Sequence, residues 1–99
     1  MTAAMRIGKQ DYTVEGRGGI YKVTLSWYRT SRSAKRWEVS LWRGTPRFIF
    51  GLFKRWRWQR MRTEANIRRL VAARHIYDGM REEADALAAG PLVGQEAIA

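Results

Sequence analysis

The chain has 99 residues, of which 45% are hydrophobic and 12% aromatic, with a formal net charge of +10 at pH 7 and no cysteine. This length and composition suit one domain with a small core, and the lack of cysteine excludes disulfides, thiolate metal sites and cysteine nucleophiles. We expect a cytoplasmic protein, because no segment reaches the roughly 20 apolar residues of a membrane-spanning helix and no secretory signal stands at the N-terminus.

The first elements along the chain are predicted strands. One starts after Met5 and ends at the turn signal GRGG, residues 16–19. Residues 20–28 and 36–43 each alternate apolar and polar side chains, which is typical of strands with one face in water. The short polar linker 29–35 predicts an antiparallel hairpin between them, with a basic tip.

The next segment, residues 46–58, fits two structures. A helix would gather most of its apolar residues into one stripe, with Thr45 as N-cap and Pro46 at the first helical position. A strand would place Trp56 and Trp58 on one face, interrupted by Lys54. We prefer the helix. Its stripe would consist of Phe48, Ile49, Leu52, Phe53 and Trp56.

A second, longer helix is predicted from Thr63 to about Ala89, where Gly90 and Pro91 end it. The pattern continues through Gly79, so we expect one unbroken helix. Its apolar stripe consists of Leu70, Ala73, Tyr77, Met80, Ala84 and Leu87. The spacing of the last four apolar residues of this stripe also allows a homodimer through this helix.

These elements predict an α+β fold: a three-stranded antiparallel β-meander followed by one short and one long C-terminal α-helix, packed on one sheet face. The domain would span residues 1–90, with 91–99 as a flexible tail. In element order alone, this arrangement resembles the sheet-reading DNA-binding domains of the integrase-arm type and the double-stranded RNA-binding fold. No diagnostic motif of either family stands in the sequence.

Positive charge is concentrated in one part of the chain. Residues 1–74 hold eighteen of the nineteen lysines and arginines, and the acidic residues predominate after them. Eleven cations and one acidic residue lie within 29–62, which favours a polyanionic partner. Arginine outnumbers lysine fifteen to four; this suits bidentate phosphate binding, although a GC-rich coding genome gives the same excess.

Catalysis is not expected. The one histidine, His75, lies two positions before Tyr77, which places them about 160° apart on a helix. No catalytic or phosphate-loop motif is present. We therefore predict no enzyme activity, no metal and no cofactor.

The basic and aromatic residues predict a nucleic-acid-binding protein, because cations neutralise phosphates and flat rings stack on unpaired bases. On the preferred helix Trp56 joins the core, while Trp58 points outward with Lys54 and Arg57. Trp42 also lies on the polar face of its strand. The candidate binding residues are Arg29, Arg32, Lys35, Arg36, Trp42, Arg47, Lys54, Arg55, Arg57, Trp58, Arg60 and Arg62.

Two other partners remain open. Tryptophan, tyrosine and arginine are the residues that protein interfaces favour, so the chain can also be a small phage- or plasmid-type regulator that binds an acidic host protein. The segment 46–62 has the composition of an amphipathic helix that binds anionic membranes from the surface.

Overall fold

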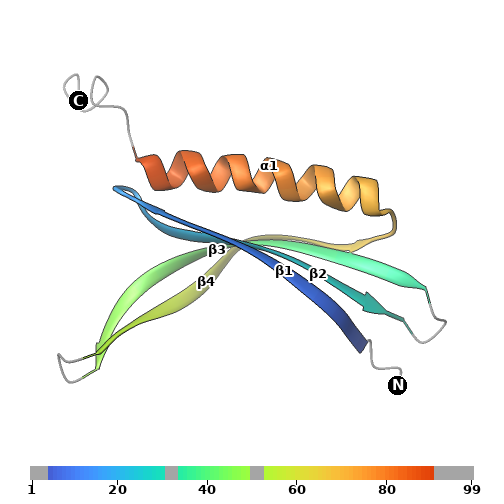
Figure 1. The fold of residues 1–99 in the computed structure, drawn as a ribbon, viewed down its shortest axis with the longest axis horizontal. Coiled ribbons are helices and arrows are strands. Elements are labelled where there is room, and N and C mark those ends of the chain that lie inside the picture. The colour runs from blue at the N-terminus through green and yellow to red at the C-terminus, as the bar shows by residue number, and fades with distance from the viewer. Residues whose placement is uncertain (1–4, 31–33, 50–52, 91–99) are drawn as a thin grey trace.

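Four strands follow one another along the chain and pair in that order as an antiparallel meander, and one helix follows them (Figure 1). The computed structural model describes residues 5–30, 34–49 and 53–90. The elements are β1 (Met5–Gly16), β2 (Gly19–Arg29), β3 (Lys35–Ile49), β4 (Phe53–Ile67) and α1 (Leu70–Ala89). The predicted tail 91–99 lies outside the described residues, and the α+β class is confirmed.

The segment expected as a short helix belongs to two strands instead. Residues 46–49 end β3, and residues 53–58 begin β4, so the sheet has four strands rather than three. The alternation of arginine and tryptophan over 55–58 is the strand period of two, and aromatic side chains favour strands. The helical stripe was a coincidence of apolar residues at the end of β3 and the start of β4; its member Leu52 lies outside the described residues.

The long helix starts later than predicted. Residues 63–67 still belong to β4, and α1 begins at Leu70. Between them, Asn66 has a φ of 56°, in the left-handed region that asparagine adopts more readily than most residues. At the other end Gly90, with a φ of 75°, caps the helix as the sequence predicts, and its N–H donates to the carbonyl of Leu87.

The last third of β3 extends beyond β2. Ile20 pairs with Gly44, and past this point β3 pairs with β4 alone. Residues 45–49 and 53–57 therefore form a two-stranded projection, the β3–β4 arm, which extends away from α1 (Figure 1). Pro46 lies in this arm, where the missing N–H costs no bond to β2.

The core lies between α1 and one face of the sheet. The helix presents small residues alongside Tyr77 and Met80, which lets it approach β2 and β3 closely. Val23, Val39 and Met80 are fully buried there. The buried core residues are Tyr21, Val23, Leu25, Val39, Leu41, Ala73, Tyr77, Met80, Ala84 and Ala88. Most of the predicted helical stripe is thus buried on the chain's own sheet, although Leu70 is exposed.

Polar contacts attach α1 to both edges of the sheet. Arg62 on β4 forms an ion pair with Glu83 at 2.7 Å, and the Tyr12 hydroxyl on β1 donates to the Asp85 carboxylate at 2.5 Å. The Gly18 N–H, in the β1–β2 turn, donates to the Ala88 carbonyl at 2.8 Å. The helix is therefore held over the sheet along its second half.

Candidate functional site

The face of the sheet opposite α1 is the candidate site. No element in the described part of the chain covers it, and both ends of β3 curve away from the helix (Figure 1). We call it the open face. Among the described residues there is no helix with both the length and the apolar character needed to cross a membrane.

A row of three side chains crosses the open face from β2 to β4. Lys22 pairs with Trp42, and Trp42 pairs with Arg60. The Lys22 Nζ lies 5.6 Å from the centroid of the Trp42 ring, and the Arg60 Cζ lies 4.8 Å from it. Both distances are within the range of cation–π attraction, so the indole is bracketed by two cations.

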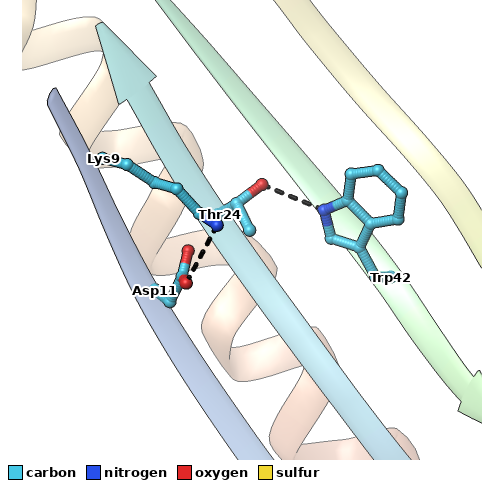
Figure 2. Close-up of polar contacts among 4 residues, drawn as sticks. All are labelled: Lys9, Asp11, Thr24 and Trp42. Carbon is cyan, nitrogen blue, oxygen red and sulfur yellow. Dashed lines mark hydrogen bonds and ion pairs between the residues drawn. The ribbon is translucent and has the colours of Figure 1, made fainter. Parts of the chain in front are cut away.

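The Trp42 ring is held in place by a hydrogen bond. Its Nε1–H donates to the Thr24 Oγ1 at 2.9 Å, across the β2–β3 pair (Figure 2). Thr24 is 7% exposed. A buried hydroxyl needs a partner, and the indole supplies one, so the bond fixes the orientation of the ring. The half-exposed Trp42 indole, which the sequence places on the polar face of its strand, thus has a defined orientation on the surface.

Trp58 lies beside this row. The Lys22 Nζ is 4.3 Å from the centroid of the Trp58 ring, so one ammonium group makes cation–π contacts with both indoles. Gly44 is the partner of Trp58 across the strands. A Cβ at Gly44 would lie 2.6 Å from the Ile20 Cγ2 and 3.0 Å from the Trp58 ring. The missing side chain therefore leaves the space in which Trp58 and Ile20 pack.

Lys22 is the electrostatic centre of the site. Burial lowers its pKa below the ordinary value of 10.5, and the charge of Lys9 lowers the pKa further, while Asp11 opposes this shift. Asp11 is itself paired with Lys9 at 3.3 Å on β1 (Figure 2). The lowered pKa means that the Lys22 ammonium is incompletely compensated, so an added anion would be favourable.

The sequence-predicted residues divide between the two faces. Trp42, Trp58, Arg60 and Arg36 have the strand phase of the open face. Arg36 donates through Nε to the Asn66 Oδ1 at 3.2 Å. The opposite phase holds Arg29, Lys35, Arg55, Arg57 and Arg62. Arg57 and Trp58 therefore lie on opposite faces, whereas the helix prediction placed them together.

Four predicted residues are not available, or not described, as part of the open face. Arg32 lies outside the described residues, and for Arg47 and Lys54 only the backbone, in the β3–β4 arm, is described. Arg62 is already paired with Glu83 on α1.

Lys22 and Thr24 were not predicted. Their signal was present, because both alternate with the apolar residues of β2 in the same phase that leaves Trp42 on the polar side of β3. What the sequence does not give is the register that pairs Lys22 with Trp42.

The histidine lies elsewhere. His75 is exposed on α1, while Tyr77 is buried against the sheet, as the helical spacing predicts. Within the described ranges, no group of three or more histidine and acidic side chains is arranged to hold a metal ion.

Fold and site together define a small α+β domain whose antiparallel sheet is covered by a C-terminal helix on one face and carries two indoles in contact with cations on the other. Comparisons with protein-family models, curated proteins and solved structures found no match.

Proposed function

We propose that this chain is a non-catalytic nucleic-acid-binding protein whose interface is the open face together with the β3–β4 arm. The observation that carries the proposal is the placement of Trp42 and Trp58 with Lys22 and Arg60 on a sheet face that no described element covers. Single-stranded DNA or RNA fits this face best, because unpaired bases can reach the rings.

The cations and rings act together in this scheme. A base stacks on an indole or on the outer plane of Arg60, which already lies over Trp42. The Lys22 ammonium then exchanges part of its contact with the indoles for a phosphate oxygen. Each phosphate neutralised in this way releases condensed counterions, which provides much of the binding free energy.

The charge distribution favours the sheet and its β3–β4 arm over the outer side of α1, although Arg55, Arg57 and Arg62 have the strand phase opposite to the open face. No acidic residue lies between Glu38 and Glu64, the stretch that forms most of β3, the arm and most of β4. The acidic residues of α1 lie on the opposite side of the sheet; they are Asp78, Glu82, Glu83 and Asp85. A polyanion is therefore drawn toward the sheet and the arm and repelled from the outer side of the helix.

We rank the membrane hypothesis below nucleic-acid binding. It assumed an amphipathic helix within residues 46–62, whereas residues 46–49 belong to β3 and residues 53–62 to β4. An acidic protein partner would contact the same cations as a nucleic acid. The experiments below distinguish these two kinds of partner.

The test compares single substitutions by fluorescence anisotropy with a labelled single-stranded oligonucleotide. Trp58→Ala and Arg60→Ala should each weaken binding by about tenfold, since stacking on one aromatic ring contributes on the order of 1–3 kcal/mol. Arg68→Ala removes an equivalent exposed charge outside the open face and should change affinity far less. Thermal unfolding checks that each variant is folded.

The same titrations at increasing salt give a second criterion. Log affinity should fall linearly with log salt, with a slope of about −0.7 for each phosphate contacted on a single strand. An equal loss in all three variants, or an affinity that does not depend on salt, contradicts the proposal. Stoichiometric capture of one acidic protein after nuclease treatment would favour the protein partner instead.

A further inference from the structure

A second aromatic and basic site lies on the helix side of the sheet, where α1 begins. A cavity of about 220 Å³ opens there beside Trp27, Trp37, Leu25, Leu70, Lys35 and Arg74. A more polar cavity of about 300 Å³ adjoins it, sharing Gln10, Leu25 and Arg74. None of the residues of this groove belongs to the open face.

Two indoles form the apolar wall of the first cavity. Trp27 on β2 and Trp37 on β3 are directly paired across the strands, and both are half-buried. The Trp27 ring lies against β1 at Gly8, where a Cβ would come within 2.3 Å of its Cζ2. The absence of a side chain at Gly8 therefore leaves room for the Trp27 indole. The β1–β2 register shifts at the same point, between Arg6 and Gly8.

Cations occupy the rim of the same cavity. Lys35 stands at the start of β3, and Arg74 stands on the second turn of α1. Within the described ranges neither head group has an acidic partner within 4 Å. The first turn of α1 contains no acidic residue, so the positive end of the helix dipole adds to these two charges.

The second cavity contributes hydrogen-bonding groups and one negative charge. Gln10 offers an amide that can both donate and accept, and Asp78 lines the cavity together with Arg74 and Arg81. The Arg81 guanidinium lies over the Tyr12 ring at 4.3 Å, which holds it at the far end of the groove. Anionic groups are therefore best accommodated near Arg74 and Lys35, away from Asp78.

We infer that this groove binds a nucleotide: a planar heteroaromatic ring packed on Trp27 and Trp37, with its phosphate held by Lys35 and Arg74. The volume of the first cavity suits one ring rather than a peptide or a helix. Paired indoles provide the stacking surface that a base requires, and the two cations provide the charge-assisted bonds that a phosphate requires. The ligand is either a free mononucleotide or the 5′-phosphorylated end of a strand.

The experiment follows the tryptophan indole N–H resonances by NMR during titration with AMP. The Trp27 and Trp37 resonances should shift, while those of Trp42 and Trp58 stay in place. Lys35→Gln and Arg74→Gln should each weaken AMP binding by about tenfold, as expected for the loss of one charge-assisted contact. Arg68→Gln, an exposed arginine outside the groove, serves as the matched control.

Fragments of AMP test separately whether the base packs on the indoles and whether the phosphate binds the cations. Adenosine and ribose 5-phosphate should each bind at least about tenfold more weakly than AMP, since each lacks one set of contacts. The inference is overturned if ribose 5-phosphate binds as well as AMP, if AMP shifts only the open-face indoles, or if Arg74→Gln leaves the affinity unchanged. Absence of any shift at the groove indoles with both millimolar AMP and a 5′-phosphorylated oligonucleotide also overturns it.

Two oligonucleotides that differ only in a 5′-phosphate distinguish the sources of the nucleotide. In an Arg60→Ala background, a Trp27 shift with the phosphorylated strand but not with AMP identifies the strand end as the ligand. A shift with AMP identifies the free nucleotide. Because the groove and the open face use different tryptophans, failure here does not affect the proposal for the open face, and the converse also holds.

Discussion

Lys22 is the residue on which the open face depends most, because its ammonium contacts both Trp42 and Trp58. Its pKa is lowered by burial and by the charge of Lys9, so Lys22 loses its proton at a lower pH than a lysine with the ordinary pKa of 10.5. A phosphate beside the ammonium would favour the charged form and raise the pKa again. Binding of a polyanion is therefore coupled to uptake of a proton by Lys22.

This coupling gives a pH prediction. As pH rises through the lowered pKa toward 10.5, the free protein must take up a proton to bind, so oligonucleotide affinity should decrease progressively over that window. Lys22→Arg stays charged throughout and should lack this component of the pH dependence. Anisotropy titrations of both proteins at a series of pH values measure the difference. Identical profiles for the two proteins would show that Lys22 does not titrate in the interface.

The residue scale also shows what the sequence could provide. Alternation in the two central strands predicts that Trp42 lies on the polar face, and it does. The same alternation does not reveal that Trp42 pairs with Lys22 and donates to Thr24, because these contacts depend on register. Register is set by the length and conformation of a turn, and the sequence of the 29–35 linker does not determine them.

At the scale of elements, the main difference between prediction and structure lies at residues 46–58. Aromatic residues dominate this segment and occupy both strand faces, which produces the apolar stripe of a helix by coincidence. The decisive interaction is nonlocal: β4 pairs with β3 from Trp37↔Ile67 to Ile49↔Phe53, which no local pattern reveals. The C-terminal helix was predictable, because its stripe repeats over several turns and Gly90 ends it.

The continuity of α1 through Gly79 gives a stability prediction. A Cβ at Gly79 meets no atom within 4 Å, so Gly79→Ala should stabilise the protein by about 0.5–1 kcal/mol through helix propensity. Gly18→Ala is the opposite case, because its Cβ would collide with the Leu87 carbonyl oxygen. It should destabilise the protein and loosen the β1–β2 turn from the helix.

Urea unfolding, followed by circular dichroism, measures both effects. If Gly79→Ala lowers stability, α1 does not run unbroken through this position. If Gly18→Ala is neutral, the turn does not pack on the end of the helix as described.

At the scale of the whole molecule, the charge separation along the sequence becomes a separation in space. The acidic residues of the C-terminal part lie on α1, on one side of the sheet, and the basic stretch between Glu38 and Glu64 forms most of β3, the arm and most of β4. The sequence predicts the α+β class and a basic surface with indoles. It does not predict which cations share a face with those indoles, because that depends on the fourth strand and on the bulge between Leu41 and Trp42.

The five tryptophans divide by face: Trp42, Trp56 and Trp58 have the phase of the open face, whereas Trp27 and Trp37 lie on the helix side. The most direct test of the proposed interface is therefore to record the indole N–H resonances with a single-stranded oligonucleotide that carries hydroxyl groups at both ends. Binding at the open face predicts that Trp42 and Trp58 shift as the oligonucleotide saturates the protein. Saturation that leaves both resonances unchanged would contradict it.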